Sequence, residues 1–248
     1  MKKEKPILKI FCDFDGTIAK NDVCINSFDN FIEDKKAHVE IIEKYCNYEY
    51  SSREANLKEL ELIDNFDFKK FNEHLDIEPL DETFKNFVRY CKDNQHELII
   101  VSEGYDYYIE HIMKREKIDL KFYANKLTTY VGKDGKLKVT CEFPNSEEMC
   151  SWCGTSKRNV IINNTNDLYN EVSVFIGDGA SDACAVNYAD IVFAKGRLAS
   201  FCWKNNITYH EFNNFDDILK KLDKLKSENK IKHRQTAKTH RKDVLLGG

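Results

Sequence analysis

Two carboxylates stand close together near the start of the chain, in the motif Asp13-Phe14-Asp15-Gly16-Thr17. The motif follows an apolar run, so both carboxylates can leave the end of a strand and point into one crevice. One of them can act as a nucleophile while the other transfers a proton. Gly16 permits a close turn, and the Thr17 hydroxyl can bond to a carboxylate or phosphate oxygen. The spacing of a calcium-binding loop is absent, which leaves an Asp-rich turn without function as the alternative.

A second motif, Ser102-Glu103-Gly104, follows the apolar run that ends at Val101. A hydroxyl at a strand end, before a helix whose first N–H groups face the same way, suits a phosphate oxygen. Serine also caps helices routinely, so this motif alone is equally compatible with a structural role.

A third motif runs from Gly177 to Asp182 (GDGASD) and again follows an apolar run. Asp178 stands between two glycines and is suited to a cation that prefers oxygen ligands, such as Mg²⁺. Asp182 lies one helical turn further on, where it could instead cap a helix. Phosphoryl transfer beside three aspartates needs a fixed positive charge. Lys157, at the start of a predicted helix between the second and third motifs, is best placed to supply it.

Strands and helices are predicted to alternate along most of the chain, which favours an α/β fold with a doubly wound parallel sheet. Such sheets place their chemistry in the loops at the carboxyl ends of the strands, where all three motifs fall. We expect a core domain of residues 1–20 and 81–226, a helical insert of 21–80 and a basic tail of 227–248. Strands are predicted at 7–12, 97–101, 172–176 and 190–193, a β-hairpin at 126–142, and helices at 22–35, 38–48, 52–63, 68–75, 81–94, 105–117, 157–163 and 180–188.

The ordered motifs resemble those of the haloacid-dehalogenase (HAD) superfamily of phosphatases. The resemblance rests on Asp13 to Thr17, Ser102, Lys157 and the pair Asp178 and Asp182, and it spans residues 7–194. It implies a Rossmann-like core, a helical C1-type cap of the phosphoserine-phosphatase-like branch, and a small β-hairpin. The implied activity is Mg²⁺-dependent hydrolysis of a small phosphomonoester through an aspartyl-phosphate intermediate.

The resemblance also implies a role for each motif residue. Asp13 is the nucleophile and a metal ligand, Asp15 is the acid and base and offers its backbone carbonyl to the metal, and Asp178 completes the protein ligands. Asp182 and Gly179 support this arrangement, with Asp182 orienting Lys157 or the waters on the metal. The phosphate is held by Ser102, Glu103, Gly104, Lys157, Thr17 and Gly16.

Finer features are closest to the methionine-salvage phosphatases that act on 2-hydroxy-3-keto-5-methylthiopentenyl-1-phosphate. They are the pair Asn21-Asp22, the run from Gly104 to Tyr108 and the cysteine-rich segment before Lys157. Phosphocholine, phosphoethanolamine, pyridoxal phosphate and phosphoserine are alternative substrates, and a phosphotransferase is an alternative activity. Phosphoserine is disfavoured because the position of an expected cap arginine falls on Glu59. The residues expected to determine specificity in the cap are Asn21, Asp22, Cys24, Ser27, Phe28 and Glu59.

The nine cysteines and the charge distribution bear on zinc binding, on localisation and on anionic partners. Cys141, Cys150 and Cys153 have a spacing compatible with structural zinc, but no fourth ligand follows, so packed thiols are favoured. No stretch reads as a signal peptide or a membrane span, and we expect a cytoplasmic enzyme. The net charge of −4 predicts no nucleic-acid binding, although ten Lys and Arg against three Asp and Glu from Lys220 onward could contact an anionic partner. A solvated helix end followed by a frayed terminus is the favoured interpretation of this tail.

Overall fold

A parallel sheet flanked by helices is the main feature of the computed structural model, which describes residues 6–148, 150 and 152–247. The chain divides into two compact units. Unit 1 consists of Met1–Ile18, Leu80–Val101 and Lys157–Gly248, and unit 2 consists of Ala19–Pro79 and Ser102–Ser156. The helical block predicted as an insert therefore falls in unit 2, together with a second segment from later in the chain.

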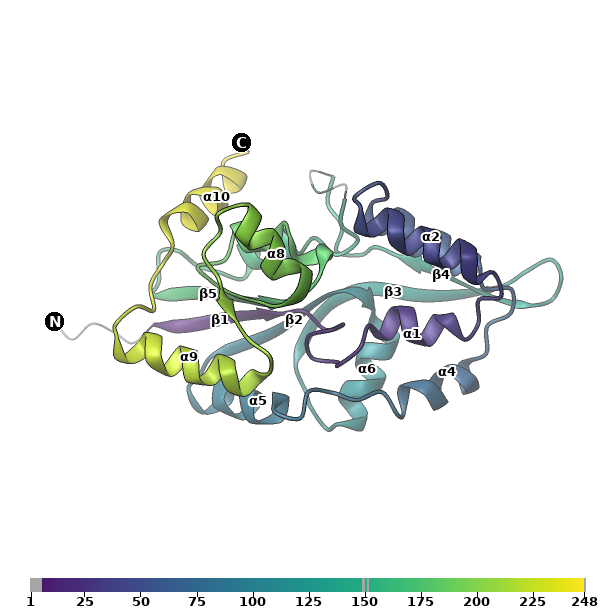
Figure 1. Ribbon diagram of the computed structural model, residues 1–248, viewed down its shortest axis with the longest axis horizontal. Coiled ribbons are helices and arrows are strands. Elements are labelled where there is room, and N and C mark those ends of the chain that lie inside the picture. The colour runs from purple at the N-terminus through teal and green to yellow at the C-terminus, as the bar shows by residue number, and fades with distance from the viewer. Residues whose placement is uncertain (1–5, 149, 151, 248) are drawn as a thin grey trace. The chain divides into compact units, whose positions relative to one another are not determined.

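Unit 1 is built on the parallel strands β1 (Ile7–Cys12), β2 (Glu97–Tyr105), β5 (Glu171–Gly177), β6 (Ile191–Ala194) and β7 (His210–Glu211), of which β2 continues into unit 2 (Figure 1). β1 pairs with β2 on one side and with β5 on the other, and β5, β6 and β7 follow in turn. Because parallel strands end at one edge of a sheet, the residues after β1 and β5 become neighbours.

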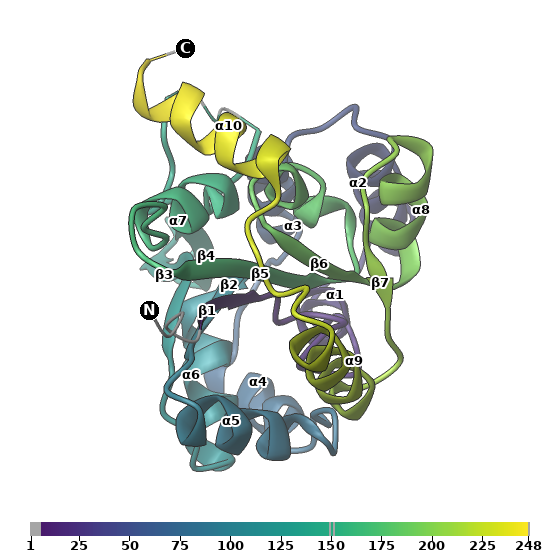
Figure 2. The same cartoon turned by 90° about the vertical axis from the view of Figure 1, so that its left-hand side faces the viewer.

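Both faces of this sheet are covered, which explains why its strands are almost continuously apolar. Figure 2 shows α5 (Phe84–Asp93) and α9 (Phe215–Ser227) on one face, and α7 (Lys157–Asn163) and α8 (Gly196–Lys204) on the other. The rings of Phe84 and Phe215 pack with centroids 4.9 Å apart, which joins α5 to α9. Burial of such aromatic side chains supplies much of the stability of a core.

Unit 2 combines helices with an antiparallel hairpin. Its helices are α1 (Val23–Asp29), α2 (Lys35–Cys46), α3 (Ser52–Glu61), α4 (Phe68–Leu75) and α6 (Asp106–Arg115), and its hairpin strands are β3 (Lys121–Val131) and β4 (Leu137–Glu142). The seven strands of the sheet follow the order β4-β3-β2-β1-β5-β6-β7. Ser51 begins α3 with the predicted capping box, in which its side chain accepts the Glu54 N–H and the Glu54 side chain accepts the Ser51 N–H.

An aromatic cluster forms the core of unit 2. Phe28 stacks on Phe71 with ring centroids 5.0 Å apart, and Phe66 lies 5.2 Å from Phe71. Tyr105, at the end of β2, packs its ring edge-on against Phe28. A helical insert of this size thus has a hydrophobic core of its own.

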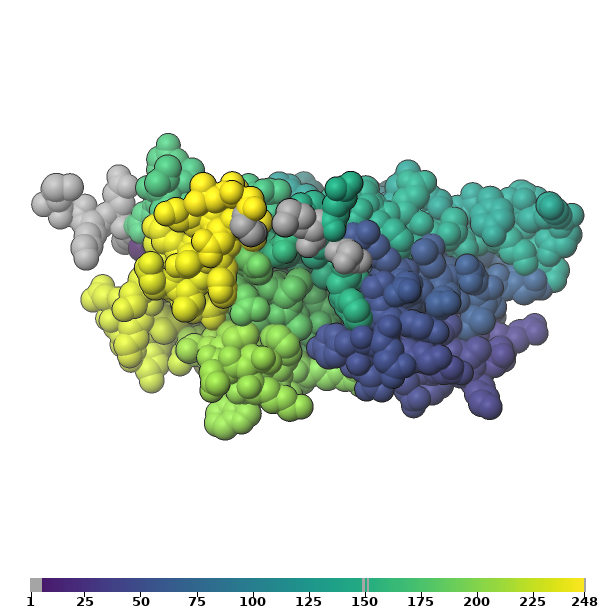
Figure 3. Space-filling view, turned by 90° about the horizontal axis from the view of Figure 1, so that it is seen from above, coloured from purple at the N-terminus to yellow at the C-terminus, as the bar shows by residue number. Residues whose placement is uncertain are grey.

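The basic tail ends in a helix, α10 (Gln235–Leu245), rather than in the frayed terminus that we favoured. The reason is Arg241, which is 1% exposed and lies within 3.3 Å of both Asp167 and Asp190. Its guanidinium also donates to the Tyr188 carbonyl at 2.6 Å. The carboxylates and the carbonyl offset the cost of burying the guanidinium charge. Figure 3 shows α10, in yellow, on the surface of unit 1.

The observed elements agree with the predicted order, with two differences that affect the site. The strand predicted over 97–101 extends to Tyr105, so the Ser102-Glu103-Gly104 motif lies within β2 and not in a loop after it. The helix predicted over 180–188 is wrong, because this stretch forms two short 3₁₀ turns at Ala180–Asp182 and Ala185–Asn187. The Asp182 carboxylate accepts backbone N–H groups of its own loop, and such bonds compete with a regular helix. Within the described parts of the chain, no helix has the length and apolar character needed to cross a membrane.

Candidate active site

The loop after β1 is folded tightly against the loop after β5. The Asp13 N–H donates to the Ile176 carbonyl at 2.9 Å, and the Thr17 hydroxyl donates to Asp178 Oδ1 at 2.8 Å. Gly16 has a φ of +68°, and a Cβ at this position would lie 2.6 Å from Asp178 Oδ2. Glycine is therefore required here both by the backbone conformation and by the close approach of the carboxylate.

The second loop is held in shape by Asp182. This side chain is fully buried, and its Oδ2 accepts the N–H groups of Asp178 and Gly179 at 3.0 and 3.1 Å. Asp182 Oδ1 accepts a hydrogen bond from Lys157 at 2.6 Å. Because both of its oxygens already serve the loop and the lysine, Asp182 supports the site while Asp13 and Asp178 are better suited to hold a cation.

Lys157 brings a single positive charge into this cluster from the first residue of α7. Its side chain is fully buried, and its Nζ lies 2.7 Å from Asp13 Oδ1. Lys157 Nζ also donates to the Ser181 hydroxyl at 3.1 Å. Ser181 belongs to the third motif, but we did not predict a role for it. A lysine buried in this way requires carboxylate partners.

Negative charge nevertheless dominates the cluster. One carboxylate oxygen each of Asp13, Asp178 and Asp182 lies within 4.8 Å of the others, and Lys157 is the ammonium group that bonds Asp13 and Asp182. Burial, followed by the charge of Asp182, raises the pKa of Asp13 well above its usual range. Burial and Asp182 likewise raise the pKa of Asp178 to about 6. A divalent cation would relieve this repulsion, and aspartate oxygens are ligands that Mg²⁺ prefers, so the residues fit the predicted metal.

Two further motif residues, Asp15 and Ser102, follow the ends of the pairing between β1 and β2. Asp15 is half-buried and stands two residues after Asp13. Ser102 is fully buried in β2, two residues beyond the pairing of Ile100 with Cys12, and its Oγ accepts the Gly104 N–H at 2.9 Å.

Glu103 differs from its predicted role in phosphate binding. Its carboxylate accepts the backbone N–H groups of Gly154 and Thr155 and the Ser52 hydroxyl. These oxygens therefore serve the structure of unit 2, and a carboxylate would in any case repel a phosphate group.

The predicted cap residues occupy three kinds of environment in unit 2. Ser27 and Phe28 are fully buried, the first bonded to the Val23 carbonyl and the second packed in the aromatic cluster, so both serve the core of the unit. Asp22 caps α1 by accepting the Ile25 N–H. The remaining three bond to other side chains. The Asn21 amide donates to Glu78, and the Cys24 thiol donates to Glu59.

Glu59 was predicted to repel a substrate carboxylate, but it has a partner that the sequence did not reveal. Glu59 Oε1 lies 2.8 Å from His38 Nε2, and His38 Nδ1 lies 3.2 Å from Asp29 Oδ1. The hydrogen bond to Glu59 raises the pKa of His38. The charge of Glu59 is thus already balanced, which weakens the basis for excluding phosphoserine.

This buried pair predicts a pH-dependent contribution to stability. Because the pKa of His38 is raised on folding, its contribution should be complete below the unfolded value of about 6.5 and lost as pH rises through the folded value. His38→Gln should therefore lower the free energy of unfolding by about 2 kcal/mol at pH 6 and by less at pH 8.5. Urea unfolding at both pH values measures this, and an equal loss at both would contradict it.

The structure gives no support to a zinc site at the three predicted cysteines. Among the described residues, the group of side chains that could hold a metal is the aspartate cluster, and Cys141, Cys150 and Cys153 lie outside it. All three are buried, and burial raises the pKa of the Cys141 thiol to about 12. A thiol in this state is a poor metal ligand, because metals bind the thiolate.

Comparison with protein families shows the family to which the chain belongs. The family model of the haloacid dehalogenase-like hydrolases matches residues 10–186, which include every residue of the aspartate cluster. The chain belongs to the haloacid dehalogenase-like hydrolase family. It is an HAD-type phosphatase, as the resemblance of the motifs implied.

Individual relatives of this HAD phosphatase agree with that assignment. It is 29% identical over 224 residues to a 2-hydroxy-3-keto-5-methylthiopentenyl-1-phosphate phosphatase of Bacillus mycoides (strain KBAB4), covering 87% of this chain and 95% of the relative. A protein of the same name from Lysinibacillus sphaericus (strain C3-41) is 29% identical, with 91% and 97% covered. A phosphoserine phosphatase solved as a phospho-aspartyl intermediate analogue has the same fold, with a TM-score of 0.66, 21% identity, and 88% and 99% covered.

Proposed function

We propose that this HAD phosphatase hydrolyses a small phosphomonoester in a Mg²⁺-dependent reaction, with Asp13 as the nucleophile. The observation that carries the proposal is the buried contact between Asp13 and Lys157, within a cluster that also contains Asp178 and Asp182. Asp13 follows the carboxyl end of a central strand. The lysine both orients its carboxylate for attack and stabilises the negative charge of that carboxylate.

The first half of the reaction transfers the phosphoryl group to the enzyme. A carboxylate oxygen of Asp13 attacks phosphorus, and the bond between phosphorus and the ester oxygen breaks. Asp15 donates its proton to the leaving alkoxide, which departs as the alcohol. The product on the enzyme is an aspartyl-phosphate at position 13.

The second half restores the enzyme. Asp15, now ionised, takes a proton from a water molecule as that water attacks phosphorus. The bond between phosphorus and the Asp13 oxygen breaks, which releases inorganic phosphate and regenerates the carboxylate. One group thus acts as acid and then as base, which restores its protonation state in each cycle.

The remaining site residues hold the phosphoryl group and the charge. Lys157 and the Ser102 hydroxyl are the proposed phosphate contacts, and Asp182 orients Lys157 through its 2.6 Å hydrogen bond. Asp13, Asp178 and the Asp15 carbonyl would hold Mg²⁺, which when bound would neutralise charge on the phosphoryl oxygens.

We propose a small metabolite as the substrate, with the methionine-salvage enol phosphate as first candidate. The support is the name shared by relatives that match 87–91% of this chain. Because these relatives are only 28–29% identical to this chain, other substrates are alternatives. They are phosphocholine, phosphoethanolamine, pyridoxal phosphate and phosphoserine. Transfer of the phosphoryl group to an acceptor other than water is the alternative activity.

A screen over phosphorylated metabolites, with Mg²⁺ and with excess EDTA, tests the proposal. We expect release of inorganic phosphate with Mg²⁺ and a loss of at least about 10²-fold in EDTA, because the aspartate cluster then lacks its cation. Readdition of Mg²⁺ should restore turnover, whereas Ca²⁺ should support little because its coordination shell is larger and looser. Full activity in EDTA would contradict the metal assignment, and phosphate recovered on an added alcohol would favour the phosphotransferase.

A further inference from the structure

Glu103 is tied to a turn that lies some fifty residues further along the chain, within unit 2. Its Oε2 accepts the Gly154 N–H at 2.7 Å, and its Oε1 accepts the Thr155 N–H at 3.0 Å. The Ser52 hydroxyl of α3 donates to the same carboxylate. Two successive backbone N–H groups thus bind the two oxygens of one carboxylate, an arrangement that is stronger than bonds between neutral groups.

The main chain of Glu103 is tied to the same turn. Its carbonyl accepts the side-chain amide of Asn125, a residue with no exposed surface. Asn125 Oδ1 in turn accepts the Thr155 hydroxyl at 3.2 Å. Gly154 packs so closely on Asn125 that a Cβ at position 154 would lie 2.5 Å from Oδ1. Side chain and backbone of residue 103 therefore fix the same two residues.

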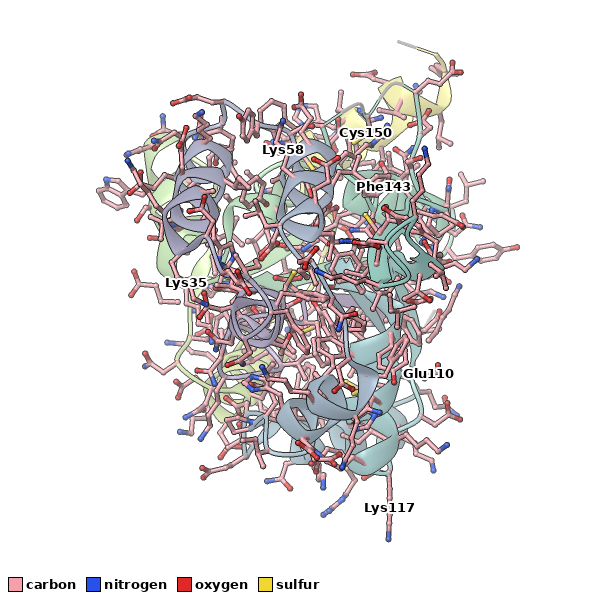
Figure 4. The ribbon with its side chains drawn as sticks, turned by 90° about the vertical axis from the view of Figure 1, so that its right-hand side faces the viewer. Lys35, Lys58, Glu110, Lys117, Phe143 and Cys150 are labelled. Atoms are coloured by element: carbon pink, nitrogen blue, oxygen red, sulfur yellow. The ribbon has the colours of Figure 1, made fainter. Side chains whose placement is uncertain are left out.

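The turn is also anchored from α3. Arg53 Nε donates to the Cys153 carbonyl at 2.7 Å, and its Nη2 donates to the Cys150 carbonyl at 2.9 Å. Figure 4 shows Cys150 and Phe143 on this segment near the helix that carries Lys58. The segment that precedes Lys157 is thus held by bonds to α3 and to residue 103, although it has no regular secondary structure.

The hydrogen bonds of Glu103 connect two segments, and each segment is next to a residue with a proposed role in phosphate binding. Ser102 directly precedes Glu103, and Lys157 comes two residues after Thr155. We propose that Glu103 is a positioning residue, which fixes the end of β2 that carries the Ser102 hydroxyl against the turn at Gly154 and Thr155 within unit 2. The inference rests on the proposed function for the role of Ser102, while the hydrogen bonds of Glu103 are visible in the structure.

Only an ionised carboxylate of this length satisfies the arrangement. Glutamine offers one acceptor oxygen in place of two, so at least one of the Gly154 and Thr155 N–H groups would lose its partner. Aspartate is one methylene shorter. A displacement of about 1 Å between groups that hold one phosphate can cost on the order of 10²-fold in rate.

The test compares Glu103→Gln with Glu142→Gln, the same change at an exposed residue of β4 paired with Lys126. We expect Glu103→Gln to lower kcat about tenfold or more and to raise the inhibition constant of inorganic phosphate by a similar factor. Glu142→Gln should change neither by more than about twofold. A purely structural role for Glu103 would lower the melting temperature and the active fraction while leaving that inhibition constant unchanged, and this result would overturn the inference.

Amide hydrogen exchange separates this inference from the proposed function. In Glu103→Gln the amides of Gly154 and Thr155 should exchange at least about tenfold faster, with α3 and the sheet unchanged. This measurement does not require turnover. If the wild-type protein hydrolyses no phosphomonoester, the proposed function fails while the exchange still tests the tie. Unchanged exchange at both amides overturns the inference even in an active phosphatase.

Discussion

Asp13→Asn should lower turnover by ~10³-fold or more, because the amide cannot form the aspartyl-phosphate. The folded protein should persist, since burial and Asp182 raise the pKa of Asp13 and the folded state already favours a neutral group there. In metal-free protein at pH 7, the free energy of unfolding should therefore be unchanged or higher. Steady-state kinetics with Mg²⁺ and urea unfolding without it measure the two effects.

The matched control for this variant is Asp134→Asn, at the exposed tip of the hairpin, where the carboxylate accepts the Lys136 N–H. It removes the same charge far from the aspartate cluster in sequence, and it should leave turnover within about twofold. Near-native turnover of Asp13→Asn would refute the nucleophile, and a large loss of stability would refute the electrostatic argument.

Lys157→Met should abolish measurable turnover and also destabilise the protein at neutral pH. The lysine is the cation that bonds both Asp13 and Asp182, at 2.7 and 2.6 Å, and its side chain has no contact with solvent. Removing one partner of a buried ion pair costs about 3–5 kcal/mol, because the remaining charges lose their compensation. Lys9→Met is a suitable control, since Lys9 pairs with Glu97 at a partly exposed position on β1 and should cost about 1 kcal/mol or less.

The destabilisation of Lys157→Met should depend on pH in a defined direction. The pKa of Asp178 is raised to about 6 with the lysine present, and loss of the lysine raises the pKa values of Asp13 and Asp178 further. Groups with a raised folded pKa favour the folded state at low pH, and this advantage is lost as pH rises through the folded value. The variant should therefore be closest to wild type near pH 5 and furthest from it near pH 8. Urea unfolding of metal-free protein at both values decides the point, and a pH-independent difference would count against it.

The residues of the aspartate cluster were predictable because they follow strands that can be recognised in the sequence. Asp13 and Asp178 each follow a buried strand, and parallel strands bring such ends together whatever the details of packing. The lysine was predictable only from its place between motifs, since nothing else in a lysine-rich chain marks position 157.

Contacts between distant segments were not predictable in the same way. Phe28 and Ser27 lie soon after the first motif, which suggested a pocket, but their burial depends on α4 and on Phe66 and Phe71 of the insert. Likewise, Glu103 sits inside a phosphate-binding motif, and only the fold shows that its partners are backbone N–H groups at 154 and 155. Such pairs carry no sequence signal, because a backbone N–H is present at almost every residue.

The C-terminal helix imposes an order on biosynthesis. Asp190 and Asp167 both bond to the guanidinium of Arg241 in α10, and Arg241 also bonds the Tyr188 carbonyl in the segment that follows the Asp178–Asp182 loop. A ribosome synthesises Arg241 only after both of these aspartates. Until then the two carboxylates lack the buried guanidinium that bonds them both, and the Tyr188 carbonyl lacks this donor. A nascent chain therefore cannot complete this buried group of charges until Arg241 has been synthesised and has docked.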